Sequence, residues 1–307
     1  MRFRFHPWQF AALLIVFCAI AVIGVYWLRV RGGTKPTELV SFLPTNDAVV
    51  VYIDVDAIRR SGILNMVAGS KAAEELEYEQ FVNQTLFDYR QDLDAVAAAF
   101  KDGQVFLVAR GRFHWKNLMD YVAHQGGTCH NGFCTADSSK PHRRVSFYPL
   151  KPDLIAMGVS QDESAAYQVM RNSGSLSLAA PNQPVWIVVP AVALKNPESL
   201  PAGTRAYASA LRNAEEIVFS IGPQQDHLQL SLQVTAKDDV SASALLVDLE
   251  NTTNALRRMI AREQLKPNPA DLSGVLTAGT FRREDRRVFG QWPIPRAFVD
   301  SLAGGSY

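Results

Sequence analysis

The sequence predicts an α+β protein with an N-terminal transmembrane helix followed by a duplicated α/β unit. The prediction depends on a long apolar run near the N-terminus, on hairpins that alternate with helices after it, and on an order of elements that recurs. Such alternation is typical of mostly antiparallel sheets with helices packed on one face. The predicted parts are a short basic tail over 1–7, a transmembrane helix over 8–28, a linker over 29–42, a first α+β unit over 43–173, a linker over 174–183 and a second α+β unit over 184–303.

The transmembrane helix is predicted from Trp8 to Leu28, a run of 21 residues with one polar side chain and no charge. At 1.5 Å per residue such a helix measures about 31 Å, which matches the hydrocarbon core of a bilayer. Aromatic residues lie at both ends, where the headgroup region favours them. No small-x-small cleavage site follows the run, so we expect it to remain as a signal-anchor. The lipid bilayer is therefore the predicted partner of residues 8–28.

Charge leaves the orientation of this helix open. Two arginines precede it, whereas Arg29, Arg31 and Lys35 follow it, and basic residues favour the cytoplasmic side. The short basic tail favours a single-pass protein of the cell inner membrane with the bulk of the chain extracytoplasmic. A cytoplasm-facing scaffold is the alternative.

The first unit is predicted to begin with a buried strand over 49–55, because a β-branched and aromatic run follows a Pro-Thr-Asn-Asp turn. A helix is expected over 63–86. The segments 93–100 and 105–110 flank a Gly-containing turn and are expected to form a hairpin. Apolar residues spaced along 115–122 indicate one face of a short helix. The remaining predicted elements are strands around Cys134, at 145–150 and at 154–159, and a helix capped by Asp162.

The second unit is predicted to repeat this order after an unpatterned polar linker. Its first strand covers 185–194, and a second hairpin joins 216–221 to 228–234. The clearest soluble helix covers 240–264, where apolar residues form one stripe and Asp238 or Asp239 lies near the cap. The other predicted elements are a helix over 205–212, strands over 274–281 and 288–292, and a last helix opened by Pro295.

The stretch LVSFLPTNDAVVVYIDVDAI, which follows the predicted anchor, resembles a group of uncharacterised bacterial single-anchor envelope proteins. Members of that group begin their exported part with a Leu-Pro, small-polar, Ala, strand pattern. The later stretch FDYRQDLDAVAAAF resembles the same group, in which an aromatic-Asp turn and an Asp-Leu-Asp lead into a strand. The resemblance covers residues 1–100 and implies an anchored envelope protein with no assigned activity.

Cys129 and Cys134 flank the tetrapeptide His-Asn-Gly-Phe, whose Asn-Gly suits a tight hairpin turn. Opposite positions in a hairpin bring Cα atoms within disulfide range, so we predict a bridge and an oxidising compartment. Two alternatives remain open. The thiols could be reduced and structural, or they could bind zinc or copper together with one or two of His130, His142 and His124. The spacing matches no established zinc motif.

No motif for a catalytic nucleophile, a zinc protease, a P-loop or a dinucleotide site is present, so we predict neither catalytic residues nor a cofactor. Asp88, Asp92 and Asp94 could form an acid/base set, but a helix end followed by a turn explains them better. The net charge is +1 and no basic stripe is present, which excludes a nucleic-acid partner.

These observations favour a membrane-anchored extracytoplasmic binding or interaction protein of the bacterial envelope. Its partner would be another envelope protein or an apolar ligand, and a solvent-exposed apolar groove would favour the ligand. The alternative is a membrane-tethered metal-binding or redox protein that uses Cys129, Cys134 and His142.

Overall fold

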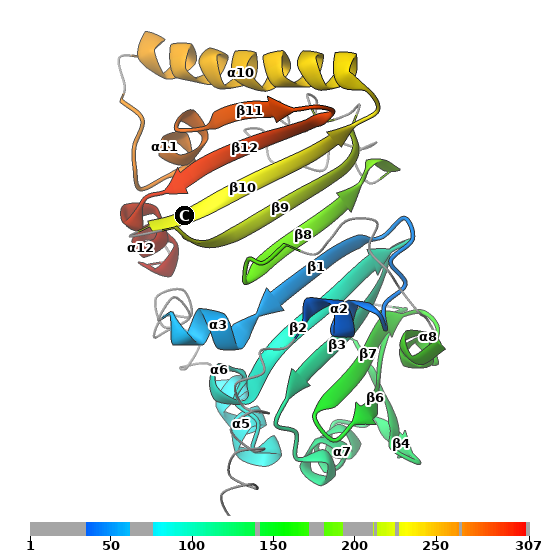
Figure 1. The fold of residues 1–307 in the computed structure, drawn as a ribbon. Coiled ribbons are helices and arrows are strands. Elements are labelled where there is room, and N and C mark those ends of the chain that lie inside the picture. The colour runs from blue at the N-terminus through cyan, green and yellow to red at the C-terminus, as the bar shows by residue number, and fades with distance from the viewer. Residues whose placement is uncertain are drawn as a thin grey trace, which may run out of the picture. The chain divides into compact units, whose positions relative to one another are not determined.

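The computed structural model describes residues 35–61, 76–138, 142–171, 181–192, 211, 214–224, 227–263 and 266–304. From Pro36 onward the chain forms one compact unit, built around a twelve-stranded antiparallel sheet (Figure 1). The strands are β1 (Val49–Asp54), β2 (Leu93–Lys101), β3 (Gln104–Gly111), β4 (Thr128–His130), β5 (Phe133–Asp137), β6 (Arg144–Lys151), β7 (Leu154–Ser160), β8 (Val185–Pro190), β9 (Ala214–Gln224), β10 (His227–Ala236), β11 (Thr280–Glu284) and β12 (Arg287–Ile294). The described helices are α2 (Pro36–Val40), α3 (Val55–Arg60), α5 (Leu76–Thr85), α6 (Tyr89–Asp92), α7 (Trp115–His124), α8 (Ala165–Arg171), α10 (Asp239–Arg262), α11 (Leu272–Thr277) and α12 (Arg296–Gly304).

Strands β1 and β8 lie side by side in the middle of this sheet. Pairing runs outward from β1 through β2, β3, β7, β6, β5 and β4, and outward from β8 through β9, β10, β12 and β11. The ladder between β1 and β8 places Val51 opposite Ile187 and Ile53 opposite Val185. The first strands of the two predicted units therefore pair with each other.

The predicted architecture of a duplicated unit, with separate sheets and helices on one face, is wrong. A single sheet spans both predicted units, and its helices pack on both faces. If β1 and β8 each ended a sheet of their own, both would be unprotected edge strands; their pairing removes two such edges. The α+β class itself is confirmed. The predicted boundaries of the parts stay predictions.

Several predicted segments lie outside the described residues. They include the predicted transmembrane helix over 8–28, the first part of the helix predicted over 63–86, and most of the second linker. In the part of the chain that the structure describes, no helix combines the length and the apolar character needed to cross a membrane.

Local sequence signals explain most described elements. The β2–β3 hairpin turns at Asp102 and Gly103, whose φ angles of 49° and 73° are those of the tight turn predicted there. The long helix α10 begins where Asp238 accepts a hydrogen bond of 2.7 Å from the Ser241 amide. The strand predicted over 274–281 is wrong in its first half. Asp271 accepts a hydrogen bond from the Ser273 amide and thereby caps the short helix α11.

The two faces of the sheet carry different helices. We call the side that carries Val50, Tyr52 and Trp186 the α2 face, because these residues form one core with Leu39, Ala165 and others from α2 and α8. The opposite side is the α10 face. Helices α10 and α11 cover it over β10 and β12, and α7 covers it over β4 and β5. In Figure 1, α2 lies in front of β2 and β3, so the α10 face points away from the viewer.

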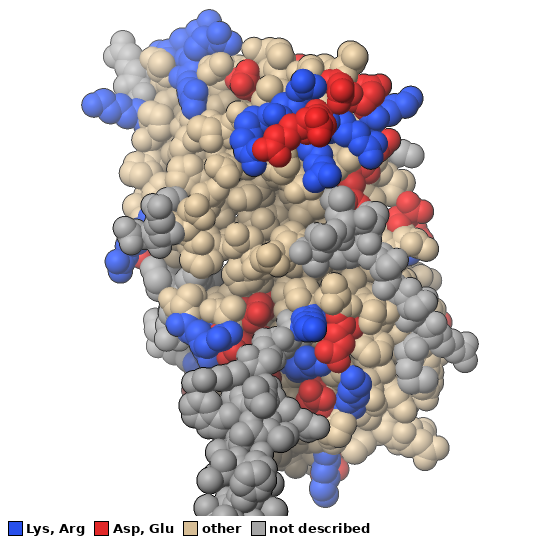
Figure 2. Space-filling view, in the orientation of Figure 1, with Lys and Arg blue, Asp and Glu red and all other residues tan. Residues whose placement is uncertain are grey.

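Charged side chains gather in several groups on the face shown in Figure 2, among them one over the β11–β12 hairpin and one near α2. The group near α2 is an ion-pair network. Glu38 lies 3.0 Å from Arg110 and 3.1 Å from Lys151, and Arg110 also lies 3.3 Å from Asp153. The network ties α2 to β3 and to the β6–β7 turn.

We expect Glu38→Gln to lower the free energy of unfolding by less than about 1 kcal/mol at pH 7, because the Glu38 side chain is 39 % exposed. Burial alone would raise the pKa of Glu38, but the hydrogen bonds and charges of Arg110 and Lys151 outweigh it and hold the pKa below its usual value. Because the pKa of Glu38 is lower in the folded than in the unfolded state, the carboxylate stabilises the fold at pH values above its unfolded-state pKa. This stabilisation is lost as the pH falls through the folded-state pKa. Urea titrations of both proteins from pH 7 to pH 3 should therefore converge at the acid end. A difference that grows toward acid pH would contradict this account.

Candidate functional site

The predicted disulfide is present between Cys129 and Cys134, with an S–S distance of 2.04 Å. The two residues lie opposite each other on β4 and β5, and the turn between them uses Asn131 and Gly132 at φ angles of 50° and 81°. These positive φ angles are the ones that Asn and Gly adopt readily, and the Asn-Gly pair predicted a tight turn for that reason. Cys134 is fully buried in a small core beneath α7. The bridge thus closes the hairpin at the outer edge of the sheet.

The candidate metal ligands Cys129, Cys134, His130 and His142 do not converge in the described structure. The bridge occupies both sulfurs, and His130 is exposed beside it. His142 lies close to the other end of β5, because Arg144 pairs with Asp137, which lies three residues beyond Cys134. Three residues of strand measure about 10 Å. Within the described ranges, no cluster of three or more His, Cys, Asp or Glu side chains could hold a metal ion.

Replacing both cysteines, Cys129→Ala with Cys134→Ala, is expected to lower the free energy of unfolding by about 2 kcal/mol, since so short a loop restricts the unfolded chain only modestly. The wild-type protein treated with a reductant should lose the same amount, and the double variant should not respond to reductant. Urea unfolding with and without reductant measures this. Equal unfolding midpoints for the wild type in both conditions would contradict the expectation.

The three aspartates considered as an acid/base set make local hydrogen bonds and ion pairs. Asp88 caps α6 by accepting a hydrogen bond of 2.9 Å from the Arg90 amide, and its own amide donates to Asp92 Oδ2 at 2.9 Å. Burial would raise the pKa of Asp88, but hydrogen bonds from Arg90 and Tyr78 outweigh it and lower that pKa. Burial raises the pKa of Asp94, which lies on strand β2. Asp88 thus fixes the start of α6, where the sequence indicated a loop, whereas Asp94 lies on β2, 3.9 Å from Arg59.

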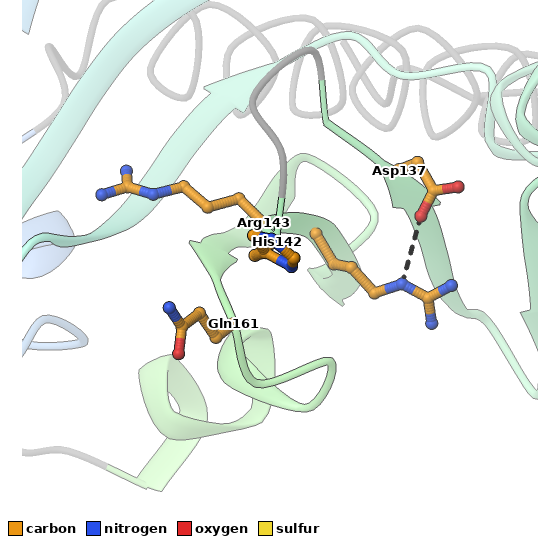
Figure 3. A pocket seen from close by; sticks show the side chains of 5 residues that line it. Asp137, His142, Arg143 and Gln161 are labelled. Carbon is orange, nitrogen blue, oxygen red and sulfur yellow. Dashed lines mark hydrogen bonds and ion pairs between the residues drawn. The ribbon is translucent and has the colours of Figure 1, made fainter.

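A pocket of about 480 Å³ opens beside the candidate residue His142 (Figure 3). It lies where β6 begins and β7 ends. Arg144 forms ion pairs with Asp137, at 3.2 Å, and with Glu163. Arg143 extends to the opposite side, the side toward which Gln161 also points. The residues that line this pocket are Asp137, His142, Arg143, Arg144 and Gln161.

The α10 face carries an apolar surface across the middle strands. Residues paired across neighbouring strands lie on the same face of a sheet. One row of such pairs runs from Ala98 through Val51 to Ile187. In the next row, Phe100 is paired with Val49. We call this surface the central apolar strip; its members are Val49, Val51, Ile53, Ala98, Phe100, Val185 and Ile187.

The central apolar strip lies between two covered regions of the same face. The core beneath α7 ends at Val96 and Leu107, and the core beneath α10 ends at Val189 and Phe219. Among the described residues, the strip contributes to neither core. Phe100 is 45 % exposed, and the valines and isoleucines of the strip are partly exposed. A continuous apolar surface without charge is the usual mark of an interaction site.

Comparisons with known proteins give a likeness of fold only. No family model matches the chain, and no curated protein matches it. Crystal form I of TP0453 aligns with a TM-score of 0.49 at 10 % sequence identity, covering 90 % of this chain and 100 % of that one. Crystal form IV of TP0453 aligns with a TM-score of 0.47 at 11 % identity, covering 89 % and 99 %. We draw no functional inference from likeness at this level.

Sequence reasoning identified the disulfide and drew attention to His142, but it missed the central apolar strip and Arg143. The strip joins residues of β1, β2 and β8, which are far apart along the chain. The sequence signal was that 49–55 and 185–194 were both predicted to be buried strands, whereas the core that contains residues of α2 and α8 includes only one face of β1.

Proposed function

We propose that this chain is an extracytoplasmic binding protein that holds an apolar ligand on the central apolar strip. The observation that supports it is the row of uncharged, apolar residues over β2, β1 and β8, on a part of the α10 face that belongs neither to the core beneath α7 nor to the core beneath α10. An enzyme would need polar groups that converge on a reacting atom, and the strip has none.

Burial of apolar surface supplies the binding energy. A ligand that covers about 200 Å² of the strip would gain about 5 kcal/mol at 25 cal/mol per Å², before the costs of ordering it are subtracted. The antiparallel sheet fixes the positions of these side chains, so little protein entropy is lost when the ligand binds. This arrangement suits a ligand recognised by shape and apolar contact.

The extracytoplasmic location is supported by the Cys129–Cys134 bridge. Disulfides persist in oxidising compartments and are rare in the cytosol, where thiols are kept reduced. The hairpin carries a disulfide, whereas a cytoplasm-facing scaffold would be expected to carry reduced thiols. The location remains part of the proposal.

Binding of the uncharged dye Nile red to the full chain tests this proposal. Ile187→Asn places a polar amide in the centre of the strip and should weaken dye binding about tenfold, a change of 1.4 kcal/mol. The matched control is Ser231→Asn, which places the same side chain on the α2 face of β10 and should leave dye binding unchanged. Circular dichroism melting of both variants checks that they fold. Equal dye affinity in folded Ile187→Asn and wild-type protein would refute the proposal.

A further inference from the structure

Arg143 and Gln161 lie on the same face of the sheet as the central apolar strip. Val145 on β6 is paired with Val159 on β7, and both lie on the α10 face. Arg143 precedes Val145 by two positions, and Gln161 follows Val159 by two. Arg143 and Gln161 each lie one residue beyond the strand, and the alternation of side chains along β6 and β7, extended by that residue, indicates the same face for both. Figure 3 agrees, with Arg143 and Gln161 extending to the same side, away from Asp137.

The guanidinium of Arg143 has no ionic partner among the described residues, whereas Arg144 has two. Arg143 is half-buried, and its Nη2 lies 3.6 Å from the position that a Cβ atom would take on Gly103 in the β2–β3 turn. Its backbone is fixed, since the Arg143 carbonyl accepts a hydrogen bond of 3.1 Å from the Ser138 amide. Among the described residues, Arg143 is therefore a cation without an ionic partner at this end of the α10 face.

The Gln161 amide is presented by an anchored turn. The Ser160 hydroxyl donates to Gln104 Oε1 at 3.1 Å and accepts from the Asp162 amide at 3.1 Å. Asp162 in turn accepts hydrogen bonds from the amide and the hydroxyl of Ser164 at the start of α8. Gln161 thus adds a neutral donor beside the Arg143 cation.

An apolar row connects this polar end to the central apolar strip. Cross-strand pairs join Val145 to Val159, Val159 to Val105, Val105 to Phe100 and Phe100 to Val49. The row crosses five strands, and its four spacings measure about 19 Å. It contains no charged or polar side chain, and Phe100, its most exposed member, belongs to the strip.

We infer that the ligand is an amphiphile with one anionic group, a carboxylate or a phosphate, bound by Arg143 and Gln161, and with an apolar chain that lies along this row onto the central apolar strip. The inference rests on the proposed function and names its ligand class. A planar guanidinium binds either anion through two parallel hydrogen bonds.

Three ligands with the same sixteen-carbon chain test this inference on the full-length protein: palmitate, hexadecyl phosphate and hexadecanol. Each is titrated against bound Nile red. We expect at least one of the two anions to bind about tenfold more tightly than the neutral alcohol. The anion that shows the larger advantage identifies the head group.

Two arginine variants assign the effect to one side chain. Arg143→Met should abolish the advantage of the anion and leave hexadecanol binding unchanged. Arg144→Met removes the paired cation on the α2 face and should keep the advantage. Melting temperatures confirm that both variants fold. If all three ligands bind equally, or if Arg143→Met keeps the advantage, this inference fails and the apolar-ligand proposal stands. If neither hexadecanol nor Nile red binds, the proposed function fails as well.

Discussion

Replacing Trp186 with alanine is expected to lower the free energy of unfolding by about 3–5 kcal/mol, the cost of emptying a large aromatic site in a core. Trp186 is fully buried on the α2 face of β8 and stacks on Tyr52 of β1, with ring centroids 5.4 Å apart. It packs in the same core as Leu39 and Val50. The substitution should therefore destabilise the strands of both predicted units together. Urea unfolding, monitored by far-ultraviolet circular dichroism and by tyrosine fluorescence, should show this as one transition.

Trp186→Phe is the matched control. It keeps an aromatic ring against Tyr52, and it removes an indole N–H for which no described residue provides a hydrogen-bond acceptor. A buried unpaired donor costs about 1–3 kcal/mol, so the loss of this group offsets part of the lost contact area. We expect the phenylalanine variant to lose less than half of what the alanine variant loses. Two separate transitions in Trp186→Ala, with the first predicted unit unaffected, would contradict the single-sheet architecture.

Gly158→Val is expected to lower the free energy of unfolding by about 1–3 kcal/mol or more, because α8 lies directly against β7 at this position. A Cβ atom on Gly158 would lie 2.7 Å from the Ala165 Cβ and 2.8 Å from the Ala165 backbone carbon. Real Cβ atoms do not approach other atoms so closely, so α8 would have to move. Thermal unfolding of the purified protein measures the loss.

The neighbouring residue provides the comparison for this prediction. Met157 points to the opposite face of β7, and Met157→Leu conserves its volume, so it should cost less than about 1.5 kcal/mol. A Gly158→Val protein as stable as Met157→Leu would show that α8 does not depend on close contact with β7.

Local features of the fold were predictable because their causes lie within a few residues. The Asn-Gly turn between Cys129 and Cys134, the β2–β3 hairpin and the cap of α10 at Asp238 are examples. Helix α11 was predicted as a strand because the apolar run over 274–281 has no helical period long enough to recognise, and the Asp271 cap that decides it lies just outside that run.

The arrangement of these elements was not predictable in the same way. The pairing of β1 with β8 joins residues more than 130 positions apart, and neither strand carries a local signal that names its partner. The candidate site could not be predicted from the sequence for the same reason. Arg143 and the central apolar strip share a face only through the register of β6, β7, β3, β2 and β1, and a sequence pattern does not state that register.

Photo-cross-linking in intact cells tests the central claim most directly. A benzophenone amino acid would replace Ile187, on the central apolar strip, and in a second protein Ser231, on the α2 face of β10. After irradiation of intact cells, the mass of the full chain is measured. We predict an added mass of a small apolar molecule at position 187 and none at position 231. No adduct at position 187, or the same adduct at both positions, would contradict the claim that the strip is the binding site.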